Sequence, residues 1–272
     1  MSTEHISGRS AEDTSGRRFA RSPWTLGKTM PGDPGVVLYC FPHSGGLAGE
    51  YIRLGRQLPG VQVYGICPPG RGGRAAEPPV TEMDALVAAL LDSTRFSGPF
   101  AFFGHSLGAL VAFEVARELC ARGRELPARL ILSAYPAPHL PRTARDLATL
   151  PDDELTEAVC DRYGGIPAEV AEDADLMELL LPAFRTDFTI LENYRHRPGA
   201  PLPVPLDILG GDQDSVTAGQ LSQWSRHTSA GFRTHRFTGG HFYFRDDPAA
   251  LITTLRAVLA PHQPTAGRGG GT

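Results

Sequence analysis

The stretch Pro99–Cys120, PFAFFGHSLGALVAFEVARELC, determines how the rest of the chain is interpreted. Four apolar residues, 100–103, run into Gly104-His105-Ser106-Leu107-Gly108, and apolar residues then recur at helical spacing. This pattern predicts a buried strand, a sharp turn and a helix. Glycines flank the turn because its backbone bends too tightly to leave room for side chains. The five residues match the G-x-S-x-G elbow, which pushes a serine hydroxyl out above a sheet.

Ser106 is the predicted nucleophile of this elbow. It lies at the start of the predicted helix, where free N–H groups and the helix dipole stabilise a developing anion. The helix has one main apolar stripe, made by Leu110, Val111, Phe113, Val115 and Leu119. A structural turn serine is the alternative, and the strand and helix around the motif favour catalysis.

Composition limits the partners and the compartment. The chain has 272 residues, a net charge of −4 and a pI of about 6.1, which argues against nucleic acid or an anionic membrane as partner. No stretch reaches the roughly 18 consecutive apolar residues of a membrane span, so we expect a cytoplasmic protein, with a monomer as the default. Four widely separated cysteines predict neither a disulfide framework nor a metal site.

The chain divides into a folded unit and two irregular ends. Residues 1–34 and 261–272 are rich in small and polar residues, and we interpret them as a disordered leader and tail. Between them, over 35–260, apolar runs alternate with helical patterns, which predicts an α/β fold with a mostly parallel sheet and flanking helices. The predicted strands outside the elbow cover 36–41, 61–67, 129–134, 204–209 and 232–237.

A segment from about 140 to 197 interrupts this alternation. Its apolar residues recur at helical spacing, which predicts several helices inserted between two strands. An insertion at this position is expected to cover the site, so we interpret it as a helical lid. An ordinary helical subdomain without a gating role is the alternative.

A serine nucleophile needs a base and a group that orients the base. The chain order serine, aspartate, histidine is that of the α/β-hydrolase fold. His241 follows a predicted strand in a Gly-Gly turn and is the predicted base, with His43 as its rival. Asp214 is the predicted acid, whereas Asp212 in the same turn is assigned an Asx-type bond.

The predicted oxyanion hole uses backbone N–H groups of Leu107, directly after the nucleophile, and of Ser44, in the loop after the first strand. A simple tight turn is the alternative for that loop. Arg71 and Arg74 follow the second strand in a Pro/Gly loop. Either they meet an anionic substrate or partner, or they are ordinary surface arginines.

With these residues in place, the chain resembles the type II, editing thioesterases of polyketide and non-ribosomal peptide biosynthesis. The matching motifs are CFPHSGG (40–46), PGR (69–71), FGHSLG (103–108) and GGHF (239–242), with lid matches at LP (150–151), GGIP (164–167), LP (181–182) and the residues Arg185, Asp187 and Phe188. The resemblance covers about residues 36–260. It supports Asp214 as the acid and Ser44 as an oxyanion donor.

The resemblance implies an enzyme that hydrolyses stalled or aberrant acyl groups from the phosphopantetheine thiol of acyl or peptidyl carrier proteins. The acyl group would pass through Ser106, and no cofactor or metal is expected. A small-molecule carboxylesterase or lipase is the alternative enzyme, and a non-catalytic binding protein of the same fold is the alternative outside enzymes.

Overall fold

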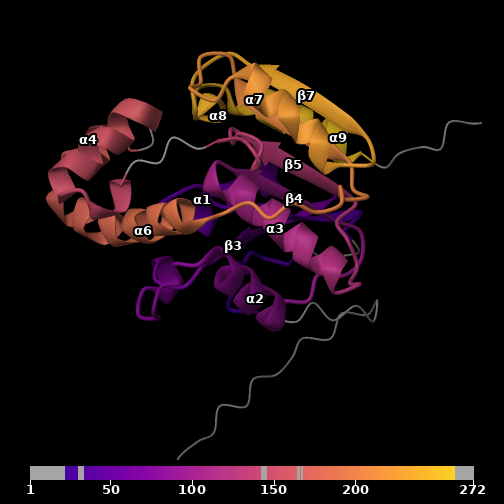
Figure 1. Ribbon diagram of the computed structural model, residues 1–272, viewed down its shortest axis with the longest axis horizontal. Coiled ribbons are helices and arrows are strands. Elements are labelled where there is room, and N and C mark those ends of the chain that lie inside the picture. Colours follow the sequence, from indigo (N-terminus) through magenta and orange to yellow (C-terminus); the bar gives the residue numbers. More distant parts are fainter. Residues whose placement is uncertain (1–21, 30–33, 142–145, 164–165, 167, 261–272) are drawn as a thin grey trace, which may run out of the picture.

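The structure, a computed structural model, is built on one seven-stranded sheet (Figure 1). It describes residues 22–29, 34–141, 146–163, 166 and 168–260. The strands stand in the order β1-β3-β2-β4-β5-β6-β7, and every neighbouring pair is parallel except β1 with β3. Their bounds are β1 Thr25–Leu26, β2 Val36–Phe41, β3 Val61–Ile66, β4 Phe100–His105, β5 Arg129–Ser133, β6 Leu206–Gly211 and β7 Phe232–Phe237.

Helices cover both faces of the sheet, which is why its central strands read as continuous apolar runs. Along β2, Tyr39 and Phe41 face the core shared with α2 and α3, whereas Leu38 and Cys40 face the core shared with α1 and α9. The helices outside the insertion are α1 Ala48–Ile52, α2 Met83–Ser93, α3 Leu107–Ala121, α7 Ala218–Ser222, α8 Tyr243–Asp246 and α9 Pro248–Leu259. The predicted α/β architecture is confirmed.

The predicted leader is wrong over residues 22–29. Trp24 is 3% exposed within the core, and Thr25 and Leu26 pair antiparallel with β3. A strand of two residues carries no periodicity, so the sequence pattern misses it. Residues 1–21, 30–33 and the tail 261–272 lie outside the described residues.

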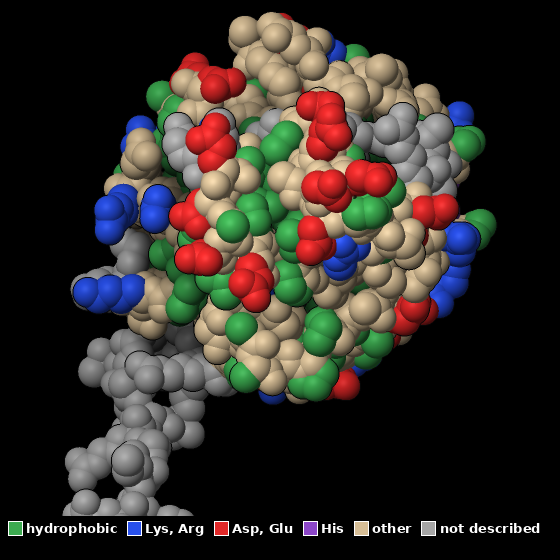
Figure 2. Space-filling model, turned by 90° about the vertical axis from the view of Figure 1, so that its left-hand side faces the viewer, with side chains coloured by type: hydrophobic (Ala, Val, Ile, Leu, Met, Phe, Trp, Pro, Cys, Tyr) green, Lys and Arg blue, Asp and Glu red, His purple; other side chains and the backbone are tan. Residues whose placement is uncertain are grey.

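The inserted segment forms a helical lid, by which we mean residues 147–193. It consists of the 3₁₀ turn η3 Leu147–Thr149 and the helices α4 Asp152–Tyr163, α5 Ala168–Ala171 and α6 Ala174–Asn193. These elements project beside the sheet in Figure 1 and share a core of their own. Acidic side chains lie among hydrophobic ones on the face of the molecule shown in Figure 2. Among the described residues, no helix is both long and apolar enough to cross a membrane.

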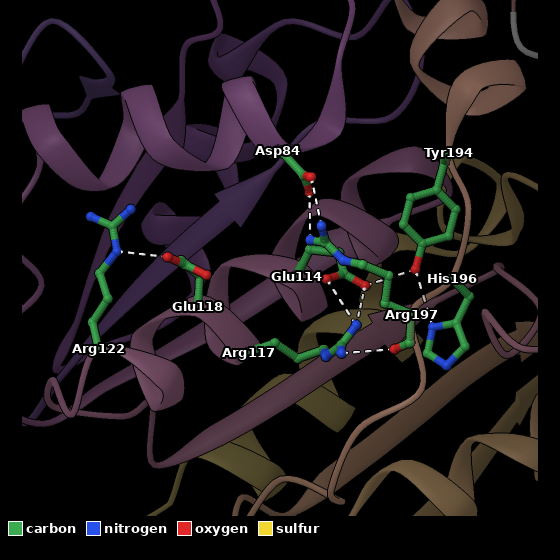
Figure 3. A network of polar contacts seen from close by, with 8 residues as sticks. All are labelled: Asp84, Glu114, Arg117, Glu118, Arg122, Tyr194, His196 and Arg197. Atoms are coloured by element: carbon green, nitrogen blue, oxygen red, sulfur yellow. Dashed lines mark hydrogen bonds and ion pairs between the residues drawn. The ribbon is translucent and has the colours of Figure 1, made fainter.

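The chain leaving the lid is fastened to the helices beneath it (Figure 3). Arg197 makes two hydrogen bonds of 2.8 Å to Asp84 of α2, and the Tyr194 hydroxyl donates to Glu114 of α3 at 2.7 Å. Arg117, also on α3, donates to the backbone carbonyl of Arg197 at 2.8 Å. These bonds hold the chain that follows α6 against α2 and α3.

Candidate active site

Ser106 occupies the corner between β4 and α3. Its backbone has φ 54° and ψ −123°, in a region that residues with a side chain rarely adopt. The Ser106 N–H donates to the Ser133 carbonyl of β5 at 2.8 Å, which ties the corner to the neighbouring strand. Strain of this kind persists only where the surrounding structure enforces it, and it collects at functional sites.

The two glycines of the elbow are required by close backbone approach. A Cβ atom added at Gly104 would lie 2.2 Å from the carbonyl oxygen of Gly108. One added at Gly108 would lie 2.0 Å from the carbonyl oxygen of Phe41. The first turn of α3 therefore packs directly against the end of β2. This contact places the Leu107 N–H, at the start of α3, near the loop that contains Ser44.

His241 and Asp214 form a hydrogen-bonded pair at the same edge of the sheet. The His241 Nδ1 donates to Asp214 Oδ2 at 2.9 Å, because a carboxylate only accepts. Their side chains are 4% and 1% exposed. This bond fixes the tautomer that leaves Nε2 of a neutral imidazole as the acceptor, which a general base needs.

The two acids in the turn after β6 have different partners. Asp212 Oδ1 accepts from the Gly239 N–H at 2.9 Å, so it joins this turn to the loop of His241. The Asx-type bond belongs to Asp214 instead, whose Oδ1 accepts from the Val216 N–H at 3.1 Å. The assignment of that bond to Asp212 was wrong.

Ser106, His241 and Ser44 line one cavity with about 330 Å³ of empty space. The lid contributes apolar side chains to its other side, so the inserted helices lie over Ser106. Its full lining consists of His43, Ser44, Ser106, Val159, Phe184, Phe188, Leu191, His241 and Phe242. A gating motion of the lid stays a prediction.

The two other histidines at the site are unsuited to accept a proton. His43 Nδ1 lies 2.7 Å from the Tyr51 hydroxyl, and burial, followed by nearby positive charge, lowers the pKa of His43 to about 3. His105 is fully buried, with Nδ1 2.9 Å from the Ser133 hydroxyl, and burial holds its pKa well below the usual range. This geometry favours His241 over His43 as the base.

Buried His43 gives the fold a specific sensitivity to acid. Its folded pKa of about 3 lies below the unfolded value of 6.5, so the unfolded chain binds more protons between these values. The stability is therefore complete above pH 6.5 and is lost as the pH falls toward 3. We expect the preferred protonation of His43 in the unfolded chain to lower the free energy of unfolding by about 2 kcal/mol between neutral pH and about pH 5.

Urea unfolding at both pH values measures this effect, with His43→Asn as the matched variant. Asparagine keeps a polar group near the Tyr51 hydroxyl but does not titrate, so the acid-induced loss in the variant should be smaller by that amount. An identical pH dependence in both proteins would show that His43 titrates normally in the folded state.

The two arginines after β3 are both engaged within the chain. Arg74 bonds to Glu77 and to the Cys67 carbonyl, and its guanidinium lies 4.5 Å from the centre of the Trp24 ring. Arg71 is buried and forms a two-pronged ion pair with Asp187 of α6. Neither side chain is therefore an ordinary surface arginine, and Arg71 joins the sheet to the lid.

Asp187 lies beside the site, but no role was predicted for it from the sequence. It appears there only within a lid motif, yet it is 2% exposed and contacts both Arg71 and the loop of Ser44. A signal was present, because Asp187 lies three residues from Phe184 and four from Leu191, on the apolar stripe of α6. A carboxylate on a buried stripe needs a partner.

The order of strands, the serine elbow and the loops at the carboxyl ends of β6 and β7 define an α/β-hydrolase fold. A model of the thioesterase domain matches residues 37–259. The sequence is 36% identical to linear gramicidin dehydrogenase LgrE of Brevibacillus parabrevis over 88% of this chain and 93% of that protein. It is 38% identical to thioesterase PikA5 of Streptomyces venezuelae over 78% of this chain and 76% of that protein.

Solved structures agree with these relatives. The type II thioesterase BorB from the borrelidin biosynthetic cluster superposes with a TM-score of 0.79 and 36% identity, over 87% of this chain and 97% of that one. The chain therefore belongs to the thioesterase family, among the type II thioesterases of polyketide and non-ribosomal peptide pathways. It is a hydrolase that acts on thioesters.

Proposed function

We propose that this enzyme removes acyl groups from the phosphopantetheine thiol of acyl or peptidyl carrier proteins, clearing stalled or aberrant intermediates. Ser106 is the nucleophile, His241 the general base, and Asp214 the acid that orients His241. The observation that carries the proposal is the His241–Asp214 pair beside the strained Ser106, in one cavity that apolar lid residues cover.

Acylation begins when His241 Nε2 takes the Ser106 hydroxyl proton and Oγ attacks the thioester carbonyl carbon. The negative charge that forms on the carbonyl oxygen is stabilised by the N–H groups of Leu107 and Ser44. When the tetrahedral intermediate collapses, the carbon–sulfur bond breaks. The imidazolium returns its proton to the leaving sulfur, and the acyl group remains as an ester on Ser106.

Deacylation repeats the same steps with water. His241 takes a proton from a water molecule whose oxygen attacks the ester carbonyl, and the same two N–H groups hold the second oxyanion. Collapse breaks the bond to Ser106 Oγ, which recovers its proton from the imidazolium. The products are a carboxylic acid, the carrier thiol and the unchanged enzyme.

The covered cavity supports a thioester substrate with an apolar acyl part. The lid contributes Val159, Phe184, Phe188 and Leu191, which bring no hydrogen-bonding side chain to the cavity.

The four free cysteines of the chain are consistent with the reducing cytoplasm. We place the enzyme there, acting as a monomer.

Substrate comparison tests the proposal directly. We expect release of an acyl group from a loaded carrier protein to have a kcat/KM at least about 10-fold above that of the p-nitrophenyl ester of the same acid. Ser106→Ala controls for background hydrolysis of both substrates. Preference for the small ester would favour a carboxylesterase or lipase, and no turnover of either would favour a binding protein.

Because LgrE is named a dehydrogenase, hydride transfer is tested beside hydrolysis. A reductase would transfer a hydride from NADPH to the acyl carbon and release an aldehyde, whereas hydrolysis releases an acid without a hydride donor. The same assay with and without NADPH is expected to yield only the acid, at equal rates. Formation of aldehyde would contradict hydrolysis as the reaction.

A further inference from the structure

The lid reaches into the loop that is proposed to hold the oxyanion. Asp187 Oδ2 of α6 accepts the backbone N–H of Gly45 at 2.8 Å, across 142 residues of sequence. Phe184, one helical turn earlier, packs against the same residue, because a Cβ atom on Gly45 would lie 2.5 Å from its ring. The loop at Gly45 is therefore seated directly on α6.

The hydrogen bond to Asp187 selects one form of a turn. The Gly46 N–H donates to the His43 carbonyl at 2.9 Å, which closes a four-residue β-turn over 43–46. Gly45 has a φ of +71°, whereas the φ of Ser44 is negative. A positive φ at the third residue of a β-turn, but not at the second, is typical of a type II turn. A type I turn would need the central peptide, between Ser44 and Gly45, to flip.

Asp187 holds that central peptide by its N–H. The other peptide beside Ser44 is held by the His43 carbonyl, since the Ser44 N–H points opposite to that carbonyl in a trans peptide. Both peptide groups that flank the Ser44 α-carbon are therefore fixed. The bond within the loop sets the direction of the Ser44 N–H, and the bond from the lid fixes the peptide on the other side of the Ser44 α-carbon.

Arg71 makes this arrangement compatible with oxyanion chemistry. A lone carboxylate close to the site would repel the negative charge of the intermediate. The Arg71 guanidinium pairs with both oxygens of Asp187, and both side chains are buried, at 7% and 3% exposed. Burial disfavours the guanidinium charge, but the Asp187 carboxylate raises the pKa of Arg71 above its usual value. The pair therefore brings no net charge to the loop at Gly45.

We propose that Asp187 is a positioning residue for catalysis: through the Gly45 N–H it keeps the oxyanion loop in the type II turn, with Arg71 as its neutralising partner. Through this bond α6 fixes the position of the loop that carries the Ser44 N–H. The lid takes part in the chemistry of the site, beyond covering it. This inference rests on the proposed function, because it concerns the donor assigned to Ser44.

A matched pair of double variants isolates the bond to Gly45. R71M/D187N and R71M/D187L both remove the buried charges and keep similar side-chain volumes, but only asparagine offers an oxygen to the Gly45 N–H. We expect kcat for an acyl-pantetheine thioester to be about 10²-fold lower in R71M/D187L than in R71M/D187N, with KM similar in both.

A spectroscopic measurement separates this role from simple loss of folded protein. A trifluoromethyl ketone analogue with a ¹³C-labelled carbonyl forms a hemiketal with Ser106, and its ¹³C shift against pH gives the ionisation of the hemiketal oxygen. This pKa should be higher in R71M/D187L than in R71M/D187N, because the anion loses a donor. Unfolded molecules do not contribute to it.

The outcomes are distinct. Equal kcat and equal hemiketal ionisation in the two folded double variants would overturn the inference while leaving the proposed function intact. If the parent enzyme itself does not hydrolyse the thioester, the proposed function fails instead. Should R71M/D187L not fold, R71M/D187A replaces it, because alanine also lacks an acceptor and introduces no new bulk.

Discussion

Ser106→Ala is expected to lower kcat for acyl-carrier hydrolysis by at least about 10⁴-fold. Without Oγ no acyl-enzyme forms, and the remaining groups can only polarise the carbonyl toward water. Rapid-quench detection of the acyl-enzyme on the parent protein, set against its absence in the variant, measures the effect. Multiple turnovers by Ser106→Ala at a parental rate would exclude Ser106 as the nucleophile.

Ser106→Gly provides the matched control, because it also lacks Oγ but tolerates the backbone of the elbow. At φ 54° an alanine keeps the strain of the parent residue, whereas glycine relieves it. Both variants should be inactive, and the glycine variant should unfold with about 1 kcal/mol more free energy than the alanine variant. Equal stability would mean that the surrounding structure bears no strain at this corner.

Asp214→Asn is expected to lower kcat by about 10³- to 10⁴-fold with little change in KM. Asparagine fits the space of the carboxylate, but it neither fixes the His241 tautomer nor stabilises the imidazolium that forms during each step. Steady-state kinetics on loaded carrier protein measure the loss. Thermal unfolding shows whether the variant remains folded, since Asp214 also accepts the Val216 N–H.

Asp212→Asn is the control within the same turn. The amide oxygen of asparagine can still accept the Gly239 N–H, so the joining of the two loops is preserved. We expect turnover within a few-fold of the parent enzyme, because Asp212 bonds to the backbone of the His241 loop, whereas Asp214 bonds to the His241 ring. A loss as large as that of Asp214→Asn would reverse the assignment of the acid.

These predictions share a physical origin in the parallel sheet. Parallel strands bring their carboxyl ends to one edge, so residues that follow β2, β4, β6 and β7 in sequence meet there. Ser44, Ser106, Asp214 and His241 each follow one of those strands, although they are far apart along the chain. The strands β2, β4 and β6 could each be recognised from their own apolar runs, and so could the residues that follow them.

Local rules were sufficient for the elements that carry the site. The strands 36–41 and 232–237 are predicted to the residue, because the pattern of side chains along a strand is a local property of the chain. The elbow was equally accessible, since a serine flanked by glycines between a strand and a helix is typical of this turn. For these parts, neighbouring residues carry the information.

Long-range contacts decided what local patterns left open. Trp24 joins the core only because β1 pairs with β3, a strand distant in sequence, and the short segment around it has no period of its own. The contacts of the two histidines favour His241 over His43 as the base, because His241 bonds to the Asp214 carboxylate whereas His43 lies against the Tyr51 hydroxyl. Asp212 likewise accepts the Gly239 N–H from a loop 27 residues away, a contact that the pattern of its own turn does not reveal.

The sequence by itself determined the fold class, the elbow of Ser106 and the candidates for base and acid, because each depends on residues close together in the chain. Only the tertiary structure decided that Asp187 of the lid pairs with Arg71 and accepts the Gly45 N–H. Asp187 lies 116 residues from Arg71 and 142 residues from Gly45 along the chain. Such contacts exist only once the sheet and the lid have packed.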